Sequence, residues 1–306
     1  MDNIEIIKNI EDSMPDSIAA IGYGSGIFKQ NGYDKNEIPD KDIILIVDDF
    51  QEFLIKDYEM NPSHFSNDFD KNVLKRKKHS EKYYNNLGCL KFYKDNIHFK
   101  VMIISKWALE HDFKTWEYFG MAGRLTKPIL YDSIPSDLEK AIEENRKNLL
   151  MTALIYNENG VIEKEELYSF LSKMTYMYDF RTILPGEKKT KYNDIVDGAI
   201  EWYDQNYFDI PTLYKVDNKI INMHPLFYVD YLPDGMSNYI KEKLKVYSAK
   251  GLQRSDIKKI QKAINSYLRK TNFSNSIKLA IASSTTLGKK ETIKHGIQKF
   301  KKHLKK

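Results

Sequence analysis

Alternating apolar and polar positions predict a sheet in the first part of the chain. Strands are expected at residues 18–23 and 40–49, and a hairpin at residues 90–93 and 97–104 turns around Lys94-Asp95-Asn96. On the last of these strands His98 and Lys100 face away from the apolar side chains. Helical spacing predicts helices over 1–15, 49–60 and 107–120. A further short strand is expected at 129–131, where it would close the sheet.

Helical periodicity dominates beyond residue 133. The spacing predicts helices over 136–156 (with Ser136 as N-cap), 163–178, 193–207 and 255–270, and a small hairpin over 213–223 that turns at Asp217-Asn218. We therefore expect an α+β fold with three parts. A domain with a mixed sheet covers 1–133, a mostly helical domain covers 134–288, and a tail covers 289–306.

Composition limits the class of protein. Hydrophobic residues make up 42% of the 306 residues, which is enough for substantial cores. The one cysteine, Cys89, excludes a disulfide framework and a cysteine metal site, and we expect it to be a small buried side chain in a reducing compartment. No apolar run reaches the roughly 20 residues of a membrane span, and the acidic N-terminus resembles no targeting signal. A soluble or peripheral protein is expected.

The positive charge is concentrated in the tail. Residues 289–306 contain eight lysines and one glutamate, so the rest of the chain is slightly acidic although the total is +5. The body is therefore not expected to bind nucleic acid. The tail has one apolar helical stripe opposite its lysines, which is typical of helices that lie on anionic membranes, although a solvated helix or a nucleic-acid arm has the same pattern. The stripe consists of Ile293, Ile297, Phe300 and Leu304.

The turn Gly24-Ser25-Gly26 follows the first strand and is a candidate phosphate site. Glycine lets backbone N–H groups approach a phosphate closely, although most glycine turns are only loops. Asp42 opens the next strand and is a candidate ligand for Mg²⁺ beside that phosphate. Side chains at i and i+2 share a strand face, so Asp40 is a candidate for the second carboxylate. Asp48 lies about 20 Å along the strand and cannot bind the same ion.

Lys100 occupies the place where nucleotidyltransferases of the polymerase-β type carry a third acid. It is a candidate phosphate contact, with a solvated strand lysine as the alternative. Asp179, from the helical part, is then the remaining candidate carboxylate. His64, in a turn-rich loop, is a candidate to orient a phosphate or a ribose, and a structural histidine is the alternative.

Five segments, taken in order, resemble one family. The chain is similar to the mitochondrial translocator assembly and maintenance type of CDP-diacylglycerol synthase, which has bacterial members, and the abundance of Lys, Asn, Ile and Tyr favours a bacterial source. The similarity runs from about residue 18 to 181 and is weaker beyond. The segments are residues 23–30 (Tyr-Gly-Ser-Gly-Ile-Phe-Lys-Gln), 42–49, 61–66 (Asn-Pro-Ser-His-Phe-Ser), 122–128 (Ala-Gly-Arg-Leu-Thr-Lys-Pro) and 179–181 (Asp-Phe-Arg).

The resemblance implies a phosphatidate cytidylyltransferase with a polymerase-β-like domain, which uses CTP, phosphatidic acid and Mg²⁺ and acts at the cytoplasmic face of a bacterial membrane. It implies metal binding by Asp42 with Asp40 or Asp179, and catalytic roles for Asp42, Ser25, Lys127 and Arg124. Implied nucleotide-binding residues are Tyr23, Gly24, Ser25, Gly26, Lys29 and His64. Implied contacts to the lipid phosphate are Arg124, Lys127, Arg181 and Lys100.

Two other functions remain open at the level of sequence. The first is a nucleotidyltransferase that acts on RNA or on a protein hydroxyl, with the basic tail binding the acceptor. The second is a catalytically degenerate, membrane-bound binding module. The absence of an acid two residues after Asp42, where the chain has Ile44, favours this last alternative.

Overall fold

A five-stranded mixed sheet forms the N-terminal part of the chain, in a computed structural model that describes residues 2–28, 39–65, 83–157, 160–179, 191–210, 213–221 and 225–287. The strand order is β3-β4-β2-β1-β5, with β2 and β4 parallel and the other pairs antiparallel. The predicted α+β class and the predicted strands are confirmed. The strands are β1 (Ala19–Tyr23), β2 (Lys41–Val47), β3 (Leu87–Lys94), β4 (Ile97–Ser105) and β5 (Ile129–Leu130).

Both faces of this sheet are buried, because α-helices cover each of them. Ile43 and Leu45 of β2 share one apolar cluster with residues of α1 (Asn3–Glu11) and α2 (Phe50–Met60). Ile44, which points the other way, belongs to a second and larger cluster. Near-continuous apolar strands of this kind are typical of a sheet covered on both sides.

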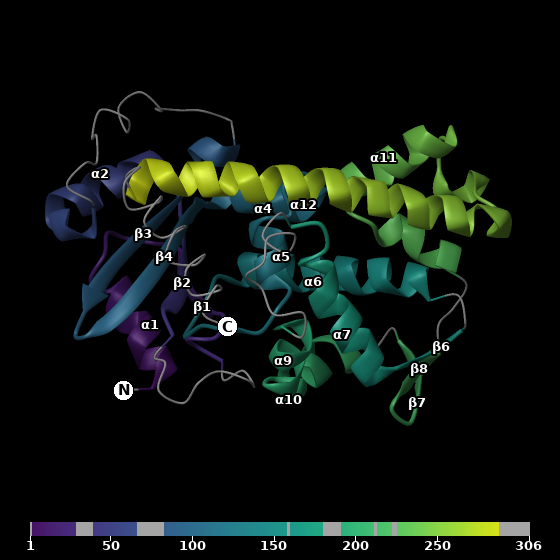
Figure 1. The fold of residues 1–306 in the computed structure, drawn as a ribbon, viewed down its shortest axis with the longest axis horizontal. Helices are drawn as coiled ribbons and strands as arrows, with labels where there is room; N and C mark the ends of the chain where they lie inside the picture. The colour runs from purple at the N-terminus through teal and green to yellow at the C-terminus, as the bar shows by residue number, and fades with distance from the viewer. Residues whose placement is uncertain are drawn as a thin grey trace, which may run out of the picture.

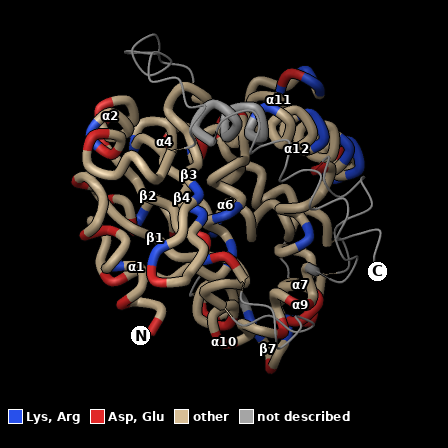
Figure 2. Tube along the Cα trace, turned by 60° about the vertical axis from the view of Figure 1, so that its left-hand side comes forward, with Lys and Arg blue, Asp and Glu red and all other residues tan. Residues whose placement is uncertain are grey.

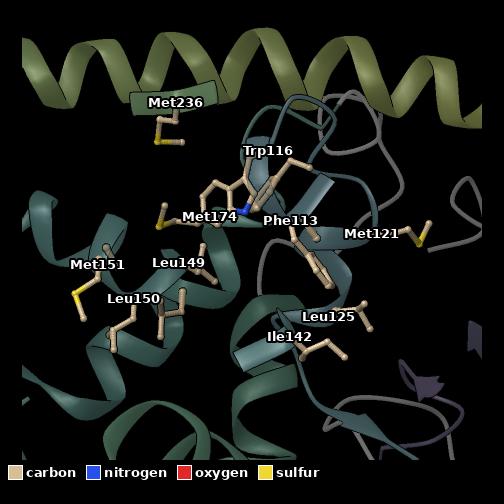
Figure 3. Packing of buried hydrophobic residues seen from close by; sticks show 14 of the residues in the cluster. Phe113, Trp116, Met121, Leu125, Ile142, Leu149, Leu150, Met151, Met174 and Met236 are labelled. Atoms are coloured by element: carbon tan, nitrogen blue, oxygen red, sulfur yellow. The ribbon is translucent and has the colours of Figure 1, made fainter. Parts of the chain in front are cut away.

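The larger cluster extends from the sheet through the helices that follow it. These helices are α4 (Lys106–Thr115), α5 (Met121–Leu125), α6 (Ser136–Tyr156) and α7 (Lys164–Met174). Figure 3 shows the buried side chains of Phe113, Trp116 and Leu149 in this cluster, with Met236 beneath the long last helix. Buried Cys89 of β3 also belongs to it, which confirms its expected burial.

A second, three-stranded sheet lies in the helical part. Its order is β6-β8-β7, from β6 (Val161–Glu163), β8 (Lys219–Ile221) and β7 (Tyr214–Val216). The predicted hairpin is β7–β8, and β6 is an additional strand that we did not predict. The expected helix over 193–207 is wrong as one element, because the chain forms α9 (Lys191–Asp197), α10 (Ile200–Tyr203) and a π-helical turn, Asp204–Phe208.

The last described helix, α12 (Ile257–Leu287), is longer than predicted and returns to the first sheet. It packs against α11 (Asp234–Leu244), α6 and β3, and it runs along the upper edge of Figure 1. The two predicted domains thus share one apolar cluster, and their boundary stays a prediction. Within the described ranges, no helix combines the length and the apolar character needed to cross a membrane.

Two predicted helix ends need correction. The helix expected over 107–120 ends at Thr115, because Trp116 adopts a left-handed conformation with φ of 51°. The N-cap of α6 is Pro135 rather than Ser136, and no side chain caps this helix start. The indole of Trp116 donates a hydrogen bond to Asn145 Oδ1 at 2.8 Å, so the turn after α4 is tied to α6.

This contact predicts the effect of Trp116→Phe. The substitution leaves the buried Asn145 acceptor unpaired, and we expect a loss of about 1–3 kcal/mol in the free energy of unfolding, measured by denaturant titration. Trp107→Phe is the matched control, since Trp107 is 45% exposed and should change stability by less than about 0.5 kcal/mol. Equal losses in the two variants would contradict the assigned role of Asn145.

Candidate active site

The turn after β1 is one tight loop of backbone. Gly24 has φ of +75°, and its carbonyl accepts hydrogen bonds from the N–H groups of Ile27 (3.1 Å) and Phe28 (2.9 Å). A Cβ at Gly26 would lie 2.0 Å from the carbonyl oxygen of Asp40, so only glycine allows the turn to lie against the chain just before β2. Within the described ranges, the N–H groups of Ser25 and Gly26 have no acceptor. The turn can therefore donate to an anion.

Asp42 lies directly beside this turn. It is paired in register with Tyr23 on β1 and with Lys100 on β4. Its Oδ1 is 3.1 Å from the Nζ of Lys100, and its Oδ2 would be 2.9 Å from a Cβ at Gly24. The glycine turn, a carboxylate and an ammonium group thus meet at one end of the sheet.

The charged character continues along the same face of the sheet. Asp40 precedes Asp42 on that face and contacts His98 Nδ1 at 2.6 Å. Lys91 of β3 lies opposite Lys100 in register, and blue segments mark this part of the sheet in Figure 2. His98 is not among the predicted site residues, although the alternation places it on the face of Lys100. Two acid–base pairs, Asp40–His98 and Asp42–Lys100, therefore follow each other along β2 and β4.

Tyr23 contributes a buried hydroxyl that has no hydrogen-bond partner within the described part of the chain. Burial is the main cause that raises the pKa of this hydroxyl, and Asp42 raises it further, while Lys100 and Arg124 act in the opposite direction. The hydroxyl is therefore protonated and can donate. A buried, unpaired donor beside charged groups is suited to hydrogen-bond a ligand.

Lys100 keeps its charge in this setting. Burial acts to lower its pKa, but the interactions with its neighbours, the Asp42 carboxylate among them, outweigh burial and raise the pKa above its ordinary value. Arg124 acts against them, because its positive charge lowers the pKa of Lys100. Arg124, from α5, thus acts electrostatically on Lys100.

A buried carboxylate fixes the helix that carries Arg124. Asp112 Oδ2 accepts hydrogen bonds from the N–H groups of Met121 (3.0 Å) and Ala122 (2.9 Å) at the start of α5. Burial raises the pKa of Asp112, and these backbone donors partly offset the effect. The guanidinium of Arg124 donates to the Gly120 carbonyl at 2.6 Å. No local signal in the sequence had marked Asp112, since its partners lie nine and ten residues away.

Asp40 and Asp42 are the carboxylates that could hold a magnesium ion. In the described ranges, no three His, Cys, Asp or Glu side chains lie close enough to bind one metal, so Asp40, Asp42 and Asp179 do not form a three-carboxylate site. Mg²⁺ is usually bound through one or two carboxylates together with substrate phosphates and water. Asp42 and Asp40, on one face beside the turn, match that pattern.

Comparison with known proteins assigns the family. The model of a family described as "Phosphatidate cytidylyltransferase, mitochondrial" matches residues 6–302 of the chain. The chain belongs to this family. The predicted resemblance is thus confirmed at the level of the family.

Individual relatives carry the same name. The protein from Schizosaccharomyces pombe is 30% identical over 64% of this chain and 49% of its own length. The relative from Caenorhabditis elegans is 29% identical over 80% of this chain and 73% of its own length. The relative from Xenopus laevis is 31% identical over 65% of this chain and 60% of its own length. The chain thus spans about half of the fission-yeast protein, and these three relatives are eukaryotic.

Two further predicted site residues, Lys127 of the first part and Asp179 of the helical part, lie close to Tyr176. The Nζ of Lys127 is 4.3 Å from the ring centre of Tyr176. The N–H of the buried Asp179 donates to the Tyr176 carbonyl at 3.2 Å. Both residues thus flank Tyr176, and their predicted roles toward the lipid phosphate and the metal stay predictions. Outside the described residues lie Lys29, Arg181, Ile293, Ile297, Phe300 and Leu304.

His64 lies on the other side of the sheet from Asp42. Its Nδ1 is 3.1 Å from both oxygens of the buried Asp57, and its ring stacks on Phe92 with 3.8 Å between centres. Phe92 belongs to the apolar cluster of Ile43, on the face opposite Asp42. These contacts are those of a structural loop histidine, and the predicted nucleotide-binding role of His64 stays a prediction.

These contacts predict the outcome of His64→Gln. The substitution removes a partner of buried Asp57, and we expect the free energy of unfolding to fall by about 1–3 kcal/mol, with CTP affinity unchanged within about twofold. Thermal unfolding and calorimetric titration measure the two quantities. His111→Gln, a partly exposed histidine paired with Glu117, is the control and should change neither. A loss of CTP affinity at unchanged stability would restore the nucleotide-binding role.

Proposed function

We propose that this chain is a phosphatidate cytidylyltransferase, which transfers CMP from CTP to phosphatidic acid and releases pyrophosphate. One observation carries the proposal. In a chain that the family model matches over residues 6–302, the carboxylate of Asp42 lies against Gly24, at a turn where the N–H groups of Ser25 and Gly26 have no acceptor in the described ranges. Donors for a triphosphate and a ligand for its metal ion thus lie side by side.

The reaction is a displacement at phosphorus. A free oxygen of the phosphatidate phosphate forms a bond to the α-phosphorus of CTP, the bond from that phosphorus to the bridging oxygen breaks, and pyrophosphate leaves with that oxygen. Such transfers depend on positioning and on neutralising charge rather than on covalent chemistry of the protein. The N–H groups of Ser25 and Gly26, with the hydroxyl of Ser25, would hold the β- and γ-phosphates.

The charged residues then have separate tasks. Asp42 with Asp40 would hold Mg²⁺, which neutralises charge on the triphosphate when bound. Lys100, fixed by Asp42, and Arg124, on α5, would orient the anionic phosphate of the lipid, as cations commonly do. A phosphomonoester is already anionic near neutral pH, so no strong general base is required.

The fold and the location are part of the proposal. A glycine turn after β1 and an acid at the start of β2 support a polymerase-β-like nucleotidyltransferase domain. The basic amphipathic pattern of residues 289–306 supports peripheral binding to an anionic membrane. The residue composition supports the cytoplasmic face of a bacterial membrane, whereas the relatives are named as mitochondrial proteins.

Pyrophosphate release tests the activity directly. The four nucleoside triphosphates are each supplied with Mg²⁺ and vesicles that contain phosphatidate. We expect turnover with CTP that depends on phosphatidate and falls by about 100-fold or more in Asp42→Asn, since the metal loses its carboxylate. Asp48→Asn is the matched control, because Asp48 follows the other end of β2, and its rate should stay within about twofold.

Three outcomes would contradict the proposal. Turnover on RNA or on a protein hydroxyl, without any with phosphatidate, would indicate another nucleotidyltransferase. CTP binding without turnover on any acceptor would indicate a binding module, consistent with the ion pair that Lys100 makes with Asp42. Full activity of Asp42→Asn would remove the proposed metal ligand.

A further inference from the structure

We propose that Asn3 and Lys41 are positioning residues that hold the glycine turn in the conformation that binds the triphosphate. The inference rests on the proposed function of the turn and extends it to two residues that do not reach the nucleotide themselves. Asn3 precedes residues 6–302, over which the chain matches its family, so the family match gives it no role.

The two side chains bind successive carbonyl groups of the turn. The Nζ of Lys41 donates to the Gly26 carbonyl at 2.5 Å and to Asn3 Oδ1 at 2.8 Å. The Nδ2 of Asn3 donates to the Ile27 carbonyl at 2.7 Å. Lys41, Asn3 and the turn therefore form a closed set of hydrogen bonds, which we call the turn clamp.

The fold places both members of the turn clamp on the face opposite the candidate active site. Lys41 alternates with Asp42 along β2, so it points to the side of the sheet covered by α1. Asn3 is the first residue of α1, whose start is capped by Asp2. The apolar contacts of Ile7 with the sheet fix α1, and so fix the distance from Asn3 to the turn.

The turn clamp determines which backbone groups remain for a ligand. The bonds from Ile27 and Phe28 to the Gly24 carbonyl make residues 24–28 a single helical turn. In such a turn the first N–H groups and the last carbonyls point in opposite directions. The turn clamp satisfies the last carbonyls, so the N–H groups of Ser25 and Gly26 are directed away from it.

A second observation supports a ligand on the other side. The hydroxyl of Tyr23, the residue before the turn, is buried without a partner in the described ranges, beside the charges of Asp42, Lys100 and Arg124. Loss of the turn clamp would free two carbonyls and let the turn rotate. The donors would then no longer be fixed for the β- and γ-phosphates.

The test compares CTP with CMP, which lacks those two phosphates. Calorimetric titration in the presence of Mg²⁺ gives the Kd of each nucleotide for wild type, Lys41→Met and Asn3→Ala. We expect each variant to weaken CTP binding about tenfold and CMP binding less than about twofold, and the KM for CTP to rise more than kcat falls. The double variant should lose less than the product of the two single effects, because the two side chains share a hydrogen bond. Lys41→Arg, which keeps a long donor, should recover part of the affinity.

Lys8→Met is the matched control on the same helix. Its side chain is 60% exposed and its Nζ lies 3.7 Å from Asp132 Oδ2, so neither nucleotide should bind differently. Equal losses of affinity for CTP and CMP in the Lys41 and Asn3 variants would indicate a general effect on folding and would overturn the proposal. Variants that bind both nucleotides as tightly as wild type does would overturn it as well. If wild type itself bound CTP no more tightly than CMP, the phosphate role of the turn, and with it the proposed function, would fail instead.

Discussion

The close packing of the glycine turn on the start of β2 is the contact on which the candidate active site depends. Gly26 lies so near the backbone of Asp40 that a Cβ would be 2.0 Å from its carbonyl oxygen, and Gly24 takes a left-handed φ beside the carboxylate of Asp42. Any larger side chain would move the turn away from the strand. The turn clamp on one face and the ion pair of Asp42 on the other then act on a turn that already touches β2.

The sheet explains why the charged groups meet at this point. Parallel pairing of β2 with β4 puts Asp42 opposite Lys100, and one step earlier along β2 Asp40 reaches His98. Farther along β2 the same face is apolar, with Ile44 fully buried under the helices. A rigid apolar support therefore ends in a charged edge, which suits a reaction that depends on positioning and electrostatics. Opposite Asp42 the neighbouring strand carries Lys100 rather than an acid, so the proposed metal ion would be bound largely by the nucleotide.

Much of this arrangement could be predicted from local patterns. Alternation gave the strands, and the i and i+2 rule placed Asp40 with Asp42 and His98 with Lys100 on shared faces. The residues that local patterns could not reveal act through distant partners: Asp112 caps a helix nine residues on, and Asn3 binds a carbonyl 24 residues away. Local patterns left His64 open between a nucleotide contact and a structural histidine, and its packing against Asp57 and Phe92 is the tertiary information that they lacked.

The most direct measurement is a crystal structure of the protein with CTP and Mg²⁺. The account predicts the β- and γ-phosphates within hydrogen-bond distance of the N–H groups of Ser25 and Gly26, with the metal ion on Asp42. Lys41 and Asn3 should keep their bonds to the Gly26 and Ile27 carbonyls. A triphosphate bound away from the turn, or a metal ion without Asp42 among its ligands, would contradict the central claim.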